Sequence, residues 1–531
     1  MTRFRLTLVI AAMSGFIALS YEILWYRAFA FASWGHPTVF GLLLGFYLLG
    51  VAFGSFGSRR WCVDTESAEE DSRRLRALAA FIFAADLVGF LVIPMLSWFA
   101  TKNWVPALGV VSLSAGLMGA VLPLVAHYGI PADDKAGANL SYVYLANIIG
   151  STAGSFLTGF VLMDAWSTRG ISVALALVGL AMVALLVVAS AWGVRRAPVI
   201  RSLAGVLAAA IACVAWSPPL FEHLYERLLM KNTYTPDARL VHVLENRHGV
   251  IVVNDRDQVY GGGAYDGAFN ISLVDNKNVV QRAFAVGALH PSPKKVLMIG
   301  LSSGSWAQII AHLPGVEDMT IVEINPGYLD LIAKYPAVRS LLTNPKVHIV
   351  IDDGRRWLLR HPPESGAKFD VLVMNTTWHW RAHITNLLSR EFLELARAHL
   401  LPGGIHYFNT TSSDEAQRTA AEVFPHAMRV INFMAVSDSP LVFDKERWNK
   451  ILSELVIEGL PVLDLKDEHH ADLLQQFLAF ADTQNTPVPY EYWGLETRDA
   501  ILARTKGVPI ITDDNMACEW KDPLKFPLEA E

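Results

Sequence analysis

Three polar segments, each directly after a short apolar run, have the residue types needed to hold a nucleoside. The run VLMI ends in Gly300-Leu-Ser-Ser-Gly304, the run TIV ends in Glu323, and the run VHIVI is followed by Asp352-Asp353. Glycines let the backbone approach a ligand closely, and the start of a helix offers unpaired N–H groups. A carboxylate about 20 residues beyond such a turn accepts hydrogen bonds from ribose hydroxyls in doubly wound folds. Each segment alone would equally well form a turn or a helix cap, but the three in this order favour a nucleoside site.

A parallel sheet is the element that would bring these segments together. From Lys294 to about residue 440, Val- and Ile-rich runs alternate with helical segments, in the order VLMIG, TIVEI, VHIVIDD, FDVLVMN and GGIHYF. This alternation predicts a parallel sheet with right-handed crossovers. Before it, residues 239–282 form short apolar runs broken by Asn, Asp and Gly, which predicts a small β-hairpin region. We therefore expect an α/β Rossmann-like domain preceded by a small β-rich subdomain.

The first 216 residues differ in composition from the remainder. Only 18% of the 531 residues are charged, against about 25% in soluble proteins. Seven apolar stretches are long enough to cross a bilayer, and they lie near residues 7–33, 38–57, 77–99, 104–127, 140–163, 170–192 and 199–217. The expected domains are a multi-pass transmembrane domain over 1–217, a β-hairpin subdomain over 222–290, and a Rossmann domain with a C-terminal extension over 291–531.

Charge and cysteine usage exclude some classes of function. Residues 1–216 have a net charge of +4 and the remainder a net charge of −10. An acidic water-facing half argues against binding of nucleic acid, whose phosphates need clustered Lys and Arg. The three cysteines, Cys62, Cys213 and Cys518, form neither a zinc spacing nor a disulfide framework. We therefore expect no metal site.

Polar residues inside the apolar stretches are further candidates for function. Glu22, Arg27 and Asp86 each cost at least a few kcal/mol in a bilayer unless they are paired or hydrated. They would serve either a substrate pathway or an interhelical polar pair that locks the bundle. In the fifth stretch, Gly150, Gly154 and Gly159 have the small-residue spacing of helices that pack closely in lipid.

The nucleoside motifs also support a resemblance to a known family. The run VLMIGLSSGSWAQIIAHLPGVEDMTIVEINPGYLDLI, followed by NPKVHIVIDDGRRWL and FDVLVMN, resembles the spermidine synthase family of aminopropyltransferases, which have a methyltransferase-type Rossmann fold. The segment GVIVVNDRDQVYGGGAYDG is similar to that family's β-rich N-terminal part. YEILWYR, GLLLGFYLLGVAFGSFGSRR and the TDDN segment from Thr512 to Glu519 are similar to its membrane-bound branch.

The resemblance implies S-adenosylmethionine or its decarboxylated form as co-substrate. Gly300, Ser303 and Gly304 would line the amino-acid side of this donor. Glu323 would hold the ribose, and Asp352 with Asp353 would face the adenine. Family members are often dimers, so a homodimer is expected.

The chain departs from the family at the catalytic position. The family's Asp at the end of the fourth strand is Asn375 here, and the glycine turn has no carboxylate. An amide can orient an amine but cannot deprotonate it. His379 is the candidate base, since histidine titrates near neutrality, and Arg381 is the candidate partner of a carboxylate on donor or acceptor. The alternative is that Trp378 and Trp380 pack the domain and the histidines lie at its surface.

The apolar stretches predict an integral membrane protein. The resemblance implies a transferase that moves an aminopropyl-type group to an unidentified small-molecule or amphiphilic acceptor and releases methylthioadenosine. The alternatives are a nucleoside-binding sensor or carrier without turnover, and a lyase or cyclase acting on S-adenosylmethionine alone. The substrate argues for a cytosolic catalytic domain at the cell membrane. The arginines near the N-terminus and in the second and sixth connections instead place residues 222–531 outside, if all seven stretches span.

Overall fold

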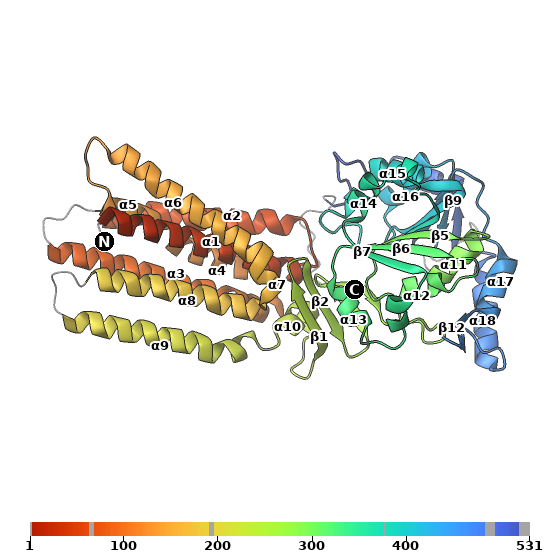
Figure 1. Ribbon diagram of the computed structural model, residues 1–531, viewed down its shortest axis with the longest axis horizontal. Coiled ribbons are helices and arrows are strands. Elements are labelled where there is room, and N and C mark those ends of the chain that lie inside the picture. The colour runs from red at the N-terminus through yellow and green to blue at the C-terminus, as the bar shows by residue number, and fades with distance from the viewer. Residues whose placement is uncertain (1–2, 63–67, 191–195, 376–377, 484–493, 520–531) are drawn as a thin grey trace. The chain divides into compact units, whose positions relative to one another are not determined.

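The computed structural model describes residues 3–62, 68–190, 196–375, 378–483 and 494–519 (Figure 1). The chain divides into two compact units. Among the described residues, the first unit consists of residues 3–33 and 38–250, and the second of Trp34–Pro37 and residues 251–519.

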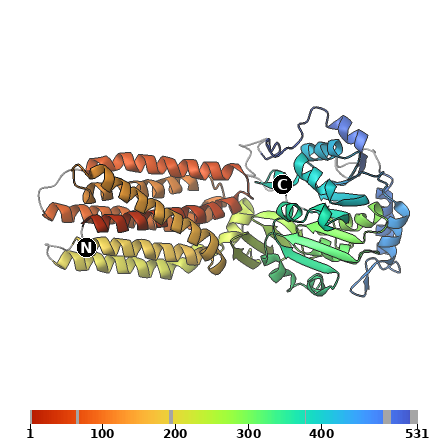
Figure 2. The same cartoon turned by 45° about the horizontal axis from the view of Figure 1, so that its top comes forward.

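The first unit is helical. Its elements are α1 (Arg3–Ala32), α2 (Thr38–Ser58), α3 (Ala68–Ala100), α4 (Ala107–Gly119), α5 (Val121–Gly129), α6 (Ala136–Leu157), α7 (Met163–Ala165), α8 (Thr168–Ala189), α9 (Arg196–Phe221), α10 (Leu224–Met230) and one strand, β1 (Leu240–Asn246). Seven helical segments within the described chain are long and apolar enough to cross a membrane. The long helices lie side by side in both views (Figures 1 and 2).

Two of the three glycines in the fifth apolar stretch are packing positions. A Cβ atom added to Gly150 would overlap the carbonyl oxygen of Ala12, and one added to Gly154 would overlap that of Phe16. Helices α1 and α6 therefore approach backbone to backbone at these two glycines, as the small-residue spacing predicts. A Cβ at Gly159 would meet open space, so this glycine does not take part in the contact.

The second unit contains the remaining elements. Its β-rich start consists of most of β2 (Gly249–Asn254), then β3 (Gln258–Gly261) and β4 (Ala264–Ala268). The α/β part consists of α11 (Gln281–Leu289), β5 (Lys295–Ile299), α12 (Ser305–Ala311), β6 (Asp318–Glu323), α13 (Gly327–Ile332), β7 (Val347–Ile351), α14 (Gly354–Arg360), β8 (Phe369–Met374), α15 (Arg390–Ala398), β9 (Leu400–Asn409), α16 (Asp414–Val423), β10 (His426–Val430) and β11 (Phe433–Ser437). The C-terminal elements are α17 (Lys445–Glu454), β12 (Val456–Ile457), β13 (Leu460–Pro461), α18 (Glu468–Phe480), β14 (Leu495–Thr497) and α19 (Arg498–Arg504).

The large sheet has the strand order β14-β10-β11-β9-β8-β5-β6-β7. The five strands from β9 to β7 pair in parallel, as the alternation of strands and helices predicts. Strands β11, β10 and β14 extend the sheet in antiparallel pairs, which the sequence did not predict. Helices α14, α15 and α16 cover one face, and α11 and α12 the other (Figure 1). This is a Rossmann-type fold.

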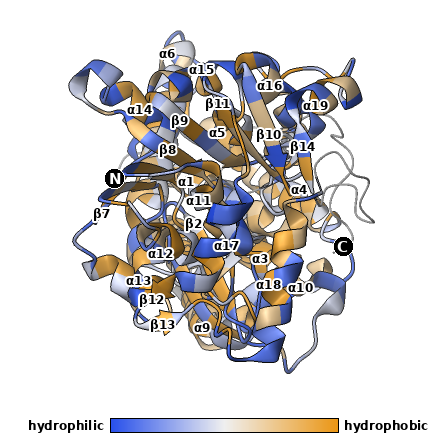
Figure 3. Cartoon of the chain, turned by 90° about the vertical axis from the view of Figure 1, so that its right-hand side faces the viewer, coloured by the Kyte–Doolittle hydropathy of each residue, from blue (hydrophilic) through white to orange (hydrophobic). Residues whose placement is uncertain are grey.

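The central strands of the sheet are buried on both faces, as a parallel sheet flanked by helices requires. Residues 296–299 of β5 and 371–374 of β8 are buried along their whole lengths. Helix α17, at the surface of this unit, is coloured largely hydrophilic in Figure 3. Burial of these strands fixes the positions of the residues that follow them.

Candidate functional site

The carboxyl ends of the five parallel strands place the predicted residues along one edge of the sheet. Ile299 pairs with Val322 on one side and with Met374 on the other, and Glu323 pairs with Ile351. The residues that end or follow the strands therefore occur in the order Asn409, Asn375, Gly300, Glu323 and Asp352. Strand order reverses between β5 and β8, and such a reversal is where doubly wound sheets bind their ligands.

The turn after β5 is held in an unusual backbone conformation. Gly300 and Gly304 have φ angles of 87° and 75°, and Ser302 between them has φ 48°. Left-handed backbone favours glycine, so the two glycines allow the chain to reverse tightly over the strand end. Ser303 is buried, and its hydroxyl donates to the Ser305 hydroxyl at 3.1 Å. The Ser303 side chain therefore stabilises the turn by bonding to the first residue of α12.

Glu323 is the best-defined candidate. Its carboxylate accepts hydrogen bonds from the Leu301 N–H at 2.7 Å and the Asn325 N–H at 2.8 Å, one on each oxygen. Only 4% of the residue is exposed, and burial raises the pKa of Glu323 to about 7 despite these hydrogen bonds. Each carboxylate oxygen keeps a second lone pair, so the group can still accept two hydroxyl hydrogens, which is what a ribose diol offers.

The two aspartates after β7 differ from each other in their contacts. Asp353 is the N-cap of α14, since its side chain accepts from the Arg356 N–H at 2.8 Å. The Asp352 carboxylate is bound by the Arg356 guanidinium and faces Arg360 at 3.7 Å. Burial opposes ionisation of Asp352, but hydrogen bonds from Arg356 hold its pKa below the usual range. A role of either residue toward adenine stays a prediction.

Asn375 and His379 have different hydrogen-bond partners. The Asn375 amide oxygen accepts from the Asn409 amide at 3.3 Å. The His379 ring Nδ1 lies 2.8 Å from the Thr411 hydroxyl, which also accepts from the His379 backbone N–H at 2.9 Å. Trp378 and Trp380 stack on each other with ring centres 6.3 Å apart.

Arg381 lies in a polar cluster that the sequence did not reveal. The Tyr328 hydroxyl donates to the Asp266 carboxylate, and Arg381 is close enough to stabilise the charge of that carboxylate. A Cβ at Gly262 would lie 2.7 Å from the Arg381 guanidinium. Burial raises the pKa of Asp266 and lowers that of Arg381. Arg381 is therefore already balanced by a carboxylate. The only sequence signal was an Asp between Tyr265 and Gly267 in the hairpin region.

The C-terminal TDDN segment fastens the loop that follows Asn375. Arg355 donates to both oxygens of Asp513, at 2.8 and 2.5 Å, and the Ser389 hydroxyl donates to Asp513 at 2.7 Å. The Glu519 carboxylate accepts from the backbone N–H and the hydroxyl of Thr385, at 3.0 and 2.5 Å. Asp513 and Glu519 therefore bind this segment to α14 and to residues 384–389.

We expect Asp513→Ala to loosen that loop. The side chain is 37% exposed, so water screens part of the ion pair, and the loss of its hydrogen bonds should be worth about 1–2 kcal/mol. Amide hydrogen exchange of residues 384–389 should accelerate by about tenfold. Asp514→Ala is the matched control, because Asp514 is exposed. Unchanged amide hydrogen exchange of residues 384–389 in the Asp513 variant would show that this segment does not stabilise them.

Two of the three polar candidates of the first unit, Arg27 and Asp86, have polar partners. Arg27 lies 3.5 Å from the carboxylate of Glu245, which also accepts from the Thr168 N–H at 2.8 Å. Asp86 is buried and accepts from the Tyr21 hydroxyl at 3.4 Å. Glu22 is half-buried and has no hydrogen-bond or ion-pair partner among the residues that the structure describes. Asp86 and Tyr21 therefore pair between helices α3 and α1, whereas Arg27 pairs with a residue of strand β1.

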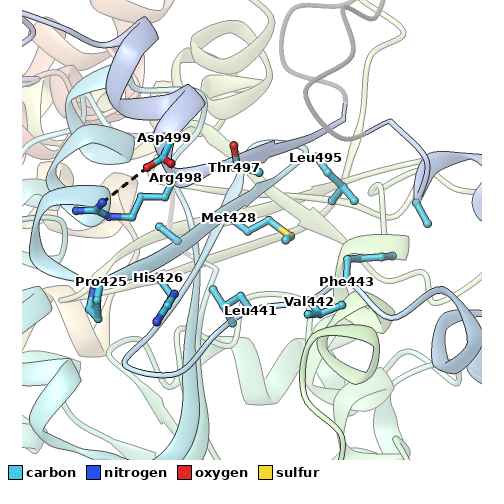
Figure 4. A pocket seen from close by; sticks show the side chains of 12 residues that line it. Pro425, His426, Met428, Leu441, Val442, Phe443, Leu495, Thr497, Arg498 and Asp499 are labelled. Atoms are coloured by element: carbon cyan, nitrogen blue, oxygen red, sulfur yellow. Dashed lines mark ion pairs between the residues drawn. The ribbon is translucent and has the colours of Figure 1, made fainter.

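Two further features of the described chain lie outside the site. The open pocket of Figure 4, lined by residues such as His426, Met428 and Thr497, lies at β10 and β14, far along the sheet from the strand ends described above. No group of three or more His, Cys, Asp or Glu side chains in the described residues could hold a metal ion.

Comparison with known proteins assigns the C-terminal region. Residues 283–435 match the family model described as the spermine/spermidine synthase domain. A polyamine aminopropyltransferase of Mycobacterium tuberculosis (strain CDC 1551 / Oshkosh) is 26% identical over 308 residues, covering 55% of this chain and 56% of that protein. A spermidine synthase of Dictyostelium discoideum is 32% identical over 117 residues, covering 22% of this chain and 39% of that protein. These relatives are transferases. The chain spans about half the length of the first of them.

Two solved structures of spermidine synthases are similar to part of this chain. The crystal structure of spermidine synthase in complex with the transition state analogue AdoDATO is 17% identical and has a TM-score of 0.32, covering 45% of this chain and 87% of that one. Spermidine synthase from Thermotoga maritima is 17% identical with a TM-score of 0.33, covering 45% and 88%. The match over residues 283–435, together with the aminopropyltransferase relatives, confirms the predicted resemblance of the C-terminal region to spermidine synthases.

Proposed function

We propose, from the premise that residues 283–435 form a spermine/spermidine synthase domain, that this chain is an integral membrane transferase of aminopropyl-type groups. The donor is S-adenosylmethionine or its decarboxylated form, and methylthioadenosine is released. The observation that carries this proposal is the buried Glu323 carboxylate at the carboxyl end of β6, which is fixed by two backbone N–H groups. Gly300, Ser303 and Gly304 form the turn beside it.

Transfer of a group from a sulfonium donor needs no covalent intermediate on the protein. A sulfonium is an activated leaving group, so the protein mainly has to align the nucleophile with the donor and exclude water. In this proposal Glu323 holds the ribose and Asn375 orients the nucleophile. His379, with its ring against Thr411, is the candidate base for a nucleophile that must lose a proton.

The membrane setting is part of the proposal. Seven long apolar segments support a multi-pass protein of the cell membrane, with a small-molecule or amphiphilic acceptor and a catalytic domain in the cytosol, where the donor is found. A homodimer is proposed by resemblance to the family. Protease accessibility of residues 222–531 in sealed vesicles of known orientation tests the side of the membrane. Digestion only from the cytosolic face is expected, and digestion from the other face would favour the topology given by the arginine count.

Product analysis by mass spectrometry tests the proposed reaction. Purified full-length chain in lipid nanodiscs is incubated with each form of the donor, labelled in the adenosine, with and without a cell extract as the source of acceptor. Methylthioadenosine that appears only with extract is the expected result. Methylthioadenosine without extract would instead show a lyase or cyclase, and S-adenosylhomocysteine would show methyl transfer. Binding of donor without any product would show a sensor or carrier.

A further inference from the structure

We infer that Asn375 presents N–H groups to the acceptor and that the acceptor reacts through a carboxylate rather than through an amine. This inference rests on the proposed function, because it names the substrate class of the same site. The observation behind it is a series of three hydrogen-bonded Asn side chains, which starts beside the Arg282 guanidinium and ends at Asn375.

The amide relay consists of Arg282, Asn432, Asn409 and Asn375. The Arg282 guanidinium donates to Asn432 Oδ1 at 2.8 Å. Asn432 Nδ2 donates to Asn409 Oδ1 at 3.1 Å, and Asn409 Nδ2 donates to Asn375 Oδ1 at 3.3 Å. The last two residues end or follow neighbouring parallel strands, β9 and β8, so the relay crosses the strand edge toward Gly300.

Two groups that can only donate fix the direction of this relay. A guanidinium has no acceptor, so the atom of Asn432 that faces Arg282 must be its oxygen. The backbone N–H of Thr411 donates to Asn409 Oδ1 at 2.8 Å, so the orientation of Asn409 is fixed independently. Amide orientation is otherwise assigned from hydrogen bonding, and here both assignments agree. Asn375 must therefore accept with its oxygen and turn its Nδ2 hydrogens away from Asn409.

The relay also begins at a positive charge that no carboxylate balances. In the described part of the chain, Arg282 binds only acceptors that carry no charge: the Asn432 amide and the carbonyl oxygens of Asn278 and Val279, at 3.0 and 2.9 Å. Its guanidinium also lies over the rings of Trp306 and Phe433. Burial lowers the pKa of Arg282 to about 10, which leaves it charged at neutral pH. Aligned amide dipoles polarise one another, so the N–H end at Asn375 becomes more positive.

This arrangement does not suit a polyamine. A reacting amine needs a base for the proton it releases, and an amide such as Asn375 is not one. The Asn375 oxygen is turned toward Asn409, so the side chain presents N–H groups rather than an acceptor to the remaining space. Within the described residues, the only hydrogen bond of the Asn375 amide is the one to Asn409, so its N–H groups remain available to a ligand. A carboxylate accepts such hydrogens and is already ionised at neutral pH.

The reaction balances without a base. One oxygen of the acceptor carboxylate forms a bond to the carbon beside the donor's sulfonium. The carbon–sulfur bond breaks, and its electron pair stays on sulfur, which leaves as a neutral thioether. An ester is formed and no proton is released. The change from Asp to Asn at this position is then a change of acceptor class rather than a loss of activity.

Separate titrations with two probes of equal carbon-chain length, a dicarboxylate and a diamine, test the inference. Full-length chain in nanodiscs is saturated with methylthioadenosine and titrated calorimetrically with succinate and with putrescine. We expect succinate to bind at least about tenfold more tightly, the value of one good hydrogen bond to a charged group. Asn375→Asp should reverse the preference. Asn449→Asp, which adds the same charge at an exposed position of α17, should leave it unchanged.

A second variant tests the relay itself. Asn432→Asp keeps an acceptor for Arg282 but removes the N–H that reaches Asn409, so the preference for succinate should shrink while methylthioadenosine affinity stays the same. A merely structural role of Asn432 would not change the charge preference. Equal or tighter binding of putrescine by the unmodified chain would overturn the inference and leave the proposed function standing. Failure to bind methylthioadenosine would instead overturn the proposed function, and the inference with it.

A carboxylate in the site has two sources, the acceptor or the amino-acid end of an intact donor. Titration of the two donor forms without any acceptor distinguishes them. If the acceptor carries the carboxylate, Asn375→Asp changes succinate binding and leaves the ratio of the two donor affinities unchanged. If that ratio changes and succinate binding does not, the acceptor assignment is wrong.

Discussion

Replacing Glu323 by glutamine is expected to weaken the binding of methylthioadenosine by about 100-fold. The carboxylate oxygens each accept one backbone N–H, and in the proposed complex each also accepts a ribose hydroxyl. Hydrogen bonds to a charged group are worth about 1.5–3 kcal/mol each, and glutamine offers one oxygen where glutamate offers two. Its NH₂ group would also face either the Leu301 or the Asn325 N–H. Calorimetric titration measures the effect, and an affinity within about threefold of the unmodified chain would contradict it.

The same carboxylate should make binding depend on pH. Burial raises the pKa of Glu323 from an ordinary 4.5 to about 7, and only the ionised form accepts both hydroxyls. Below that pKa, methylthioadenosine affinity should fall by about tenfold per pH unit. The affinity of the glutamine variant should not change with pH over this range. A pH-independent affinity in the unmodified chain would contradict the assignment of Glu323.

Folding stability should change with pH in the opposite direction. Between pH 4.5 and 7 the folded chain binds a proton at Glu323 that the unfolded chain has lost, so Glu323 makes the fold less stable as pH rises. The contribution is about 3 kcal/mol in total. The measurement is the difference in unfolding free energy between the unmodified chain and the glutamine variant, since other groups titrate in both. A constant difference across this range would contradict the raised pKa.

Gly150→Leu is expected to separate helices α1 and α6. The glycine Cα faces the carbonyl oxygen of Ala12, and an added Cβ would overlap that backbone atom rather than a movable side chain. Overpacking a core costs about 1–3 kcal/mol even where side chains can shift, so a clash with backbone should cost at least about 3 kcal/mol. Thermal unfolding of the full-length chain in detergent measures the loss.

Gly159→Leu is the matched control for this substitution. It lies in the same apolar stretch, and a Cβ there would meet open space, so stability should change by no more than about 0.5 kcal/mol. Similar losses in both variants would show that bulk in the helix, rather than contact with α1, causes the effect.

The parallel sheet and its polar edge were predictable because they depend on local patterns. Short Val- and Ile-rich runs that end in Gly300, Glu323 and Asp352 indicate strands whose carboxyl ends meet. The same patterns could not distinguish a residue that binds a nucleoside from a residue that caps a helix. Asp353 fits both patterns, and in the structure its carboxylate caps the first turn of α14.

The remaining part of the site depends on contacts between distant segments. Asp266 meets Tyr328 and Arg381 across more than 60 and more than 110 residues, and no spacing rule joins them. The amide relay likewise begins in α11 and crosses two strand ends before it reaches Asn375. From the sequence, Asn375 could be described only as an amide at the position where the family has a carboxylate. The direction in which its amide points follows from the structure, because Arg282 fixes the orientation of the hydrogen-bonded amides.

The direct test of the account is equilibrium binding of methylthioadenosine and of its 3′-deoxy analogue to the full-length chain. Glu323 at the strand edge should bind methylthioadenosine as a single-site ligand and should bind the analogue at least about tenfold more weakly, because one hydroxyl partner of the carboxylate is missing. No binding of methylthioadenosine, or equal binding of the two nucleosides, would contradict the claim that this edge of the sheet is an adenosyl site.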